Sequence, residues 1–101
     1  MSRKYRSFKE FYPFYLSEHS DRTCRRLHFI GSTLVLLLLV WIIVTANAWL
    51  LLAVPVIGYG FAWVGHFYFE RNTPATFTYP LYSLIGDWVM WKDILAGKIK
   101  I

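Results

Sequence analysis

The chain has 101 residues, which leaves room for a single domain. Apolar residues make up 56% of it and charged residues 17%, against about 45–50% and about 25% in an average soluble domain. This composition disfavours an ordinary water-soluble protein. The single cysteine excludes an intrachain disulfide and a zinc site built from several cysteines.

The first predicted element is a short amphipathic helix over residues 7–18. Aromatic and aliphatic residues recur there at the intervals of one helical face, namely Phe8, Phe11, Tyr12, Tyr15 and Leu16. Pro13 weakens this prediction, because proline lacks the backbone donor that a mid-helix position needs. Ser20 or Asp21 is expected to cap the helix that follows.

Two membrane spans are predicted next. Residues 29–65 contain no charged side chain, and this run is too long for one span but suits two. Its least hydrophobic point is Thr45-Ala46-Asn47-Ala48, and asparagine favours turns. We therefore predict spans over about 27–46 and 49–68, each close to the about 30 Å of the hydrocarbon core. Helices are expected, because an open sheet would leave backbone groups unpaired in lipid.

Basic residues flank the predicted hairpin and are absent from its turn. They are Arg3, Lys4, Arg6, Lys9, Arg22, Arg25 and Arg26 before it, and Arg71, Lys92, Lys98 and Lys100 after it. The positive-inside rule then places both termini on the cytoplasmic side of a bacterial inner membrane or an ER-type membrane. This placement favours attraction to anionic membrane lipid over binding of nucleic acid. The N-terminal segment also lacks the apolar core of a signal peptide.

A loop over residues 71–80, held by two prolines, leads to a predicted helix over residues 81–95 that ends at Gly97. This helix is apolar nearly all round and too short to span, so we expect it to be interfacial or half-inserted. The predicted fold is thus an all-α integral membrane protein, a two-span hairpin flanked by an N-terminal amphipathic helix and this C-terminal helix. Such short helices bury little surface on their own, so association into a homo-oligomer is compatible with the predicted fold.

The hairpin should bring histidines together at one end. His28 begins the first span and His66 ends the second, so antiparallel packing places them at the same membrane face. Both lie on stripes of small residues, which mark close helix contacts: Gly31 and Ser32, and Gly58 and Ala62. His19 is half a helical turn out of phase with His28. It could join them only if the helix breaks, and Ser20-Asp21 is a plausible break.

These residues admit two readings. Imidazole suits iron, zinc, copper or nickel, and histidines with a carboxylate and open positions suit non-haem Fe(II). Glu70 follows His66 by one helical turn, and Asp87 stands in an apolar segment, so either could be a ligand, a partner that orients a histidine, or a proton carrier. Alternatively, the histidines are ordinary interfacial residues and the protein is a non-catalytic module that binds lipid or a partner.

Smaller alternatives also remain open. Asp87 could cap its helix or pair with Lys92 or Arg71 instead of acting chemically. Cys24, one turn before His28, is a thiolate candidate or a small buried residue. A haem held by His28 and His66 is a third option, weakened because a porphyrin would be poorly buried at the span ends.

Several polar segments carry a resemblance to a known family. They are Tyr15-Leu-Ser-Glu-His19, Cys24-Arg-Arg-Leu-His28-Phe-Ile-Gly31, His66-Phe-Tyr-Phe-Glu70-Arg-Asn72 and Pro74-Ala-Thr-Phe77-Thr-Tyr-Pro80-Leu-Tyr-Ser83-Leu-Ile-Gly-Asp87. Over residues 11–97 the chain resembles the family of small membrane proteins that includes the yeast 2-hydroxy fatty acid dioxygenase of phytosphingosine degradation.

The resemblance implies an Fe(II)-dependent dioxygenase that shortens a 2-hydroxy fatty acid by one carbon, using O2 and no 2-oxoglutarate. It implies that His19, His28 and His66 hold the iron. Glu70 and Asp87 are then the candidate catalytic acids. Candidates for binding the substrate are Arg25, Arg71 and Asn72, although for any one arginine a role as a positive-inside anchor is the better explanation.

Overall fold

The computed structural model describes residues 5–101, so Arg3 and Lys4 of the basic N-terminal group lie outside the described residues. Within this range every regular element is helical, which confirms the all-α prediction. The main helices are α1 (Phe8–Ser17), α2 (Arg22–Thr45), α3 (Ala53–Val64) and α4 (Pro80–Leu95). Three short elements join them: the 3-10 helices η1 (Ala48–Leu52) and η3 (Ala75–Phe77), and the π-helix η2 (Gly65–Glu70).

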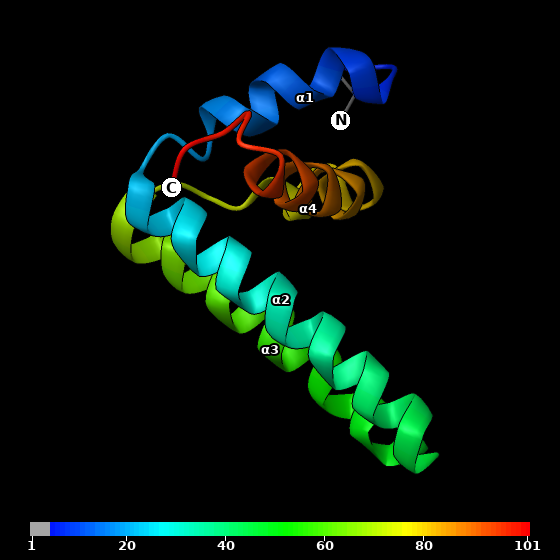
Figure 1. Cartoon of the computed structure of the whole chain (residues 1–101). Coiled ribbons are helices and arrows are strands. Elements are labelled where there is room, and N and C mark those ends of the chain that lie inside the picture. Colours follow the sequence, from blue (N-terminus) through cyan, green and yellow to red (C-terminus); the bar gives the residue numbers. More distant parts are fainter. Residues whose placement is uncertain (1–4) are drawn as a thin grey trace.

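The antiparallel hairpin of α2 and α3 dominates the shape, and α1 and α4 lie across one end of it (Figure 1). The chain reverses at Ala46, which adopts a left-handed backbone with φ of 54°. Elements η1, α3 and η2 continue one another, so the second arm is one helical rod over Ala48–Glu70. Both arms are long and apolar enough to cross a membrane.

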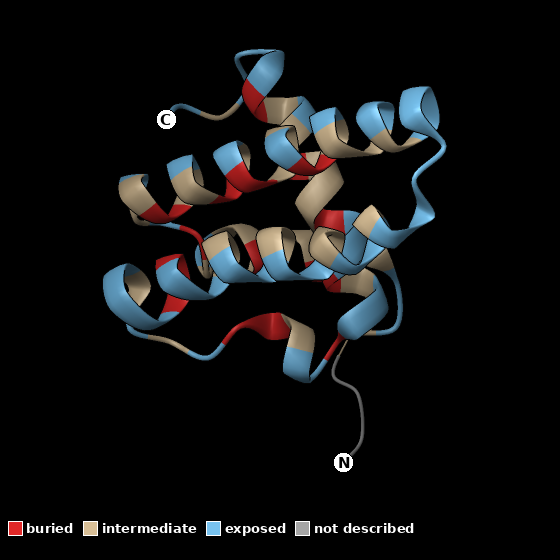
Figure 2. Cartoon of the chain, turned by 90° about the horizontal axis from the view of Figure 1, so that it is seen from below, coloured by how far each residue is buried: buried red, intermediate tan, exposed pale blue. Residues whose placement is uncertain are grey.

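The outer half of the hairpin exposes large apolar side chains. Ile43 is 79% exposed and Trp49 is 81% exposed, and further exposed residues there include Leu37, Val40, Trp41, Val44, Leu52 and Val56. Figure 2 shows buried stretches on helix faces that turn toward one another and on loops between the helices, whereas much of the helix surface is exposed. Soluble monomers rarely carry so large an apolar surface, whereas lipid would cover it.

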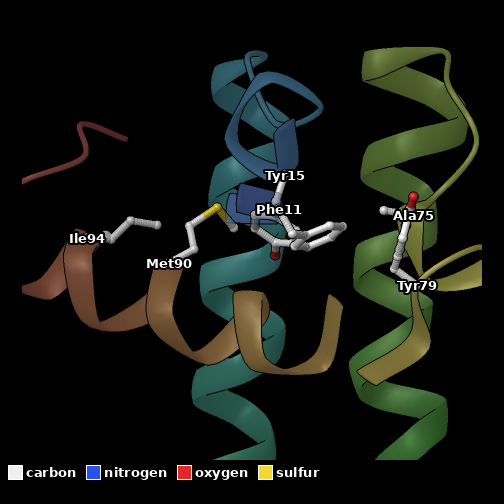
Figure 3. Close-up of a cluster of buried hydrophobic side chains, with 6 residues drawn as sticks. All are labelled: Phe11, Tyr15, Ala75, Tyr79, Met90 and Ile94. Carbon is white, nitrogen blue, oxygen red and sulfur yellow. The ribbon is translucent and has the colours of Figure 1, made fainter. Parts of the chain in front are cut away.

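Helix α1 is stabilised by Ser7, which caps its N-terminus, and by the packing of its apolar side chains against α4. The Ser7 hydroxyl accepts a hydrogen bond from the Glu10 amide at 3.2 Å. Pro13 lies on the exposed side and does not end the helix. The stripe packs against α4 and the η3 loop in the buried cluster of Figure 3, whose members are Phe11, Tyr15, Ala75, Tyr79, Met90 and Ile94.

Helix α4 is fixed to the hairpin as well as to α1. The Trp91 indole donates a 3.0 Å hydrogen bond to the Thr33 hydroxyl of α2, and the Tyr12 hydroxyl donates one of 2.8 Å to Asp93. Just beyond α4, Gly97 adopts a left-handed φ of 78°, the glycine stop that the sequence predicts. These contacts hold α1, α4 and the base of the hairpin in one packed unit.

Candidate metal centre

Three imidazoles from three different segments meet at the base of the hairpin. The Nε2 atom of His19 lies 3.1 Å from Nε2 of His28 and 3.0 Å from Nε2 of His66. All three side chains are at most 5% exposed. The structure thus brings together the three histidines that the sequence singles out as metal ligands.

His19 reaches this point because the chain breaks between α1 and α2, as the phase argument requires. Asp21 caps α2 by accepting a 3.0 Å hydrogen bond from the Cys24 amide. The Arg25 guanidinium donates to the carbonyl of His19 at 3.0 Å and to that of Ser20 at 2.7 Å. The turn that carries His19 is therefore fixed to the first turn of α2 by Asp21 and Arg25.

His66 is positioned by an unusual helix end. It lies in the π-helix η2, a geometry common at functional sites. Arg71 then adopts a left-handed backbone with φ of 57°, and the Asn72 amide bonds back to the His66 carbonyl at 3.0 Å. This return brings the Asn72 side chain against the His66 ring, where Oδ1 of Asn72 lies 2.7 Å from Nδ1 of His66.

In each of the other two histidine rings, the Nδ1 atom also lies within hydrogen-bonding distance of an oxygen. Nδ1 of His19 lies 2.6 Å from the Tyr15 carbonyl, and Nδ1 of His28 lies 3.0 Å from the Cys24 carbonyl. A carbonyl oxygen only accepts, so both nitrogens must carry the proton. With the Asn72 amide oxygen facing His66, all three neutral rings present an unprotonated Nε2 to the common point. Histidine ligands of metals are normally oriented in this way.

Three facing lone pairs repel one another unless a cation lies among them. Burial, and then the neighbouring His28 and His66, lower the pKa of His19 well below its usual value, so a proton is a poor occupant. The donor set therefore fits a metal ion. The donor atoms of His19, Cys24, His28 and His66 all lie within 4.8 Å of one another, close enough for one ion to contact several of them.

The ring orientations agree with such a site and disfavour haem. The rings of His19 and His28 meet at 88°, and those of His28 and His66 at 89°. Axial haem ligands would face each other across a porphyrin, but here the His19 ring contacts both. Cys24 is buried, and its Sγ atom lies 3.7 Å from Nδ1 of His28. It forms one group of possible ligands with the three histidines, whose donor atoms all lie within 4.8 Å of one another.

Glu70 lies at the edge of this group and contacts backbone. Its carboxylate accepts hydrogen bonds from the Asp21 amide and, at 3.3 Å, from the Ser20 hydroxyl. It thus ties η2 to the turn between α1 and α2. The one-turn spacing from His66 places Glu70 near the site, but its two oxygens are directed to the residues that follow His19.

Asp87 lies mid-helix in α4 and accepts a hydrogen bond from the Tyr15 hydroxyl. Burial raises the pKa of its carboxyl to about 6. Asp87 lies away from both ends of α4, so it does not cap this helix. Within residues 5–101 the structure shows no ion pair to Asp87, and Lys92 lies 3.7 Å from Asp93 instead. The Tyr15 ring stacks on His19 at 4.1 Å, so Asp87 connects to the histidines through Tyr15.

The substrate-binding candidates lie in three different settings. Arg25 uses its guanidinium on the carbonyls of His19 and Ser20 and on that of Lys100. Arg71 is exposed, whereas Asn72 contacts His66 and donates to the Glu18 carbonyl at 3.2 Å. Sequence reasoning did not find the orienting roles of Tyr15 and Asn72. The signal for Tyr15 is its position one turn before His19, at the C-terminal end of the predicted helix, where a side chain that follows the helix can reach a backbone carbonyl.

A small cavity of about 20 Å³ adjoins the three histidines, Tyr15, Ser83 and Asp87. This volume holds about one water-sized molecule. The Ser83 hydroxyl is buried, and within residues 5–101 it has no hydrogen-bond partner. A larger, open cleft of about 360 Å³ runs from His28 and Asp87 along the hairpin. The small cavity therefore borders all three histidines, and the cleft borders His28.

Comparison with known proteins supports a single assignment. No curated protein and no solved structure gave a significant match. One family matches, and its description reads "2-hydroxy-palmitic acid dioxygenase Mpo1-like". The match covers residues 5–99, which include α1, the hairpin, α4 and all three histidines. The chain therefore belongs to the Mpo1-like family.

Proposed function

We propose that this protein is an Fe(II)-dependent dioxygenase that shortens 2-hydroxy fatty acids by one carbon. The observation that carries the proposal is the arrangement of His19, His28 and His66, whose Nδ1 atoms face oxygens while their Nε2 atoms share one point. Among residues 5–101 this group offers four possible ligands, the three histidines and Cys24, so a six-coordinate ion would keep positions for substrate and O2. Membership of the family supports the choice of reaction.

The reaction balances with O2 as the only oxidant. The bond between the carboxyl carbon and the hydroxyl-bearing carbon breaks. The carboxyl carbon leaves as CO2, and the hydroxyl-bearing carbon becomes the new carboxyl group. O2 accepts all the electrons released and ends as one carboxyl oxygen and water, so no 2-oxoglutarate is needed. Bound Fe(II) would supply Lewis-acid and redox chemistry toward the 2-hydroxy acid and O2.

The side chains around the histidines divide the remaining work. Asp87 borders both the small cavity and the large cleft, and its raised pKa suits a group that exchanges a proton near neutral pH. Tyr15 holds that carboxyl and stacks on His19. Glu70 and Arg25 act as positioning residues for the turn that carries His19. Arg71, exposed beside Asn72, remains our candidate for steering the substrate carboxylate.

The membrane placement belongs to the same proposal. The hairpin spans the bilayer with Ala46 and Asn47 on the far side, and the histidines lie at the cytoplasmic face with both termini. The exposed apolar surface of the outer hairpin and the basic residues at its base support this orientation. A 2-hydroxy acid would reach the centre from the inner leaflet.

Metal analysis of the full-length protein, purified in detergent under anaerobic, iron-replete conditions, tests the proposal. We expect about one iron per chain, and loss of that iron in the His28→Ala and His66→Ala variants. Oxygen uptake that requires a 2-hydroxy acid, with release of the acid one carbon shorter, completes the assay. Lys9→Ala, on the exposed side of α1, is the matched control and should change neither readout.

Other outcomes separate the alternatives. A Soret band would point to haem, and stoichiometric zinc without oxygen uptake would overturn the oxygenase. A metal-free protein that folds normally would leave a non-catalytic membrane module that binds lipid or a partner. A second copy of the chain could then cover part of the exposed hairpin, and size analysis in detergent would detect it.

A further inference from the structure

The large cleft is a continuous trough along the hairpin. On α2 it is lined by His28, Val35 and Leu39, which follow one another at helical intervals on one stripe. On the second arm it is lined by Val54 and Gly58. Leu39 follows His28 by eleven positions in the sequence, so the trough extends about 16 Å at about 1.5 Å per residue.

The two ends of this cleft differ in chemistry. One end borders His28 and Asp87, next to the shared Nε2 atoms of the histidines. Away from that end the lining is aliphatic, toward Leu39 and Val54 near the turn of the hairpin. Its volume of about 360 Å³ falls within the range of ligand sites. A molecule with one polar end and a straight apolar tail matches this gradient.

We propose that this cleft binds the hydrocarbon tail of the 2-hydroxy acid, and that Gly58 determines the longest tail accepted. The inference rests on the proposed function for the identity of the polar end. The carboxyl and hydroxyl groups lie at His28 and Asp87, and the methyl end points toward Leu39 and Val54. The tail is thus held by protein and does not lie free among membrane lipids.

Gly58 provides the means to test this. A Cβ atom added there would lie 3.6 Å from Cγ2 of Val35, an ordinary contact. Because Gly58 lines the cleft, we expect a longer side chain at this position to take up part of its volume. Gly60, on the same helix, meets no atom within 4 Å and does not line the cleft. Leucine is a better helix former than glycine, so both substitutions should preserve the helix.

The first experiment locates the tail directly. A 2-hydroxy acid with a photoreactive group at its methyl end is added to the full chain in lipid nanodiscs, and labelled residues are mapped by mass spectrometry. We expect labels at Leu39 and Val54. Labels spread over the outward residues Ile43 and Val56 would place the tail in lipid and overturn the inference. Labelling needs no turnover, so it stands even if the proposed reaction fails.

The second experiment compares Gly58→Leu with Gly60→Leu across acids of increasing length. Gly58→Leu should weaken labelling and turnover of the longest acids by at least about tenfold and spare the shortest, since methylene-sized clashes have effects of this order. Gly60→Leu should match the unaltered protein. Equal length profiles for both variants would overturn the role of Gly58. If Gly58→Leu fails to fold, Leu39→Phe at the far end of the cleft provides the same test.

Discussion

The Nε2 atoms of His19 and His66 lie 3.0 Å apart, although 47 positions separate the two residues in the sequence. Asn72 contributes to this approach from both sides. Its Oδ1 atom lies on Nδ1 of His66, and its amide nitrogen donates to the Glu18 carbonyl, directly before His19. The geometry of the centre therefore depends on Asn72, which contacts His66 at Nδ1 and not at the Nε2 atom that meets His19.

Replacing Asn72 by leucine should weaken metal affinity about 10- to 100-fold, because a partner that orients a ligand has effects of this size. Asn72→Asp keeps an oxygen for Nδ1 of His66 and loses only the bond to Glu18, so it should retain most of the affinity. Competition with a chelator measures both. Equal losses in the two variants would show that the bond to Glu18, and not the orientation of His66, matters.

Glu70→Ala should destabilise the fold without removing the metal. The carboxylate accepts from the Asp21 amide and the Ser20 hydroxyl, and loss of such caps costs about 1–2 kcal/mol. Thermal unfolding in detergent and metal content per chain are the two readouts. A folded Glu70→Ala protein that has lost its metal would instead make Glu70 a ligand.

Asp87→Asn should change how stability depends on pH. The folded pKa of about 6 exceeds the ordinary 3.8, so the folded state holds the proton more tightly than the unfolded chain. The stability that Asp87 contributes is therefore complete below about pH 4 and is lost as the pH rises through about 6. Relative to Asp87→Asn, the unaltered protein should lose on the order of 3 kcal/mol across this window, since one pKa unit corresponds to about 1.4 kcal/mol. Parallel pH profiles of unfolding would contradict the assignment.

Gly86→Ala should disturb the centre through Tyr15. An added Cβ atom would lie 3.0 Å from the Tyr15 ring, which itself stacks on His19. Crowding of this kind costs about 1–3 kcal/mol, and we expect metal affinity to fall with stability. Gly60→Ala, with no atom within 4 Å, is the control and should be neutral or slightly stabilising.

Topology can be read with single cysteines in a Cys24→Ala background. Asn47→Cys, at the turn of the hairpin, should react with a membrane-impermeant maleimide added outside intact cells. Thr78→Cys, exposed at the opposite end, should react only after the membrane is opened. We expect near-complete labelling in one case and background labelling in the other. The reverse pattern would invert the proposed orientation.

Much of the architecture follows from local pattern. The charge-free run over residues 29–65, the cap at Asp21 and the stop at Gly97 are local signals, and helices begin and end close to them. The pairing of His28 with His66 also follows, since a hairpin of known length must bring its two ends together. These features depend on the periodic spacing of side chains along a helix and on the free-energy cost of unpaired backbone groups in lipid. Both can be judged from neighbouring residues in the sequence.

The tertiary structure decided what the chain pattern leaves open. Sequence alone could not tell whether the break at Ser20 turns the His19 ring inward, because that depends on Arg25 and Glu70 bonding to the turn. Nor could it assign Asn72 to His66, since their contact needs the left-handed backbone at Arg71. The partner of Asp87 is Tyr15, 72 positions away. Such contacts depend on how α1 and α4 pack across the hairpin. Packing is the sum of many weak contacts between distant residues, and the spacing of residues within one helix does not predict it.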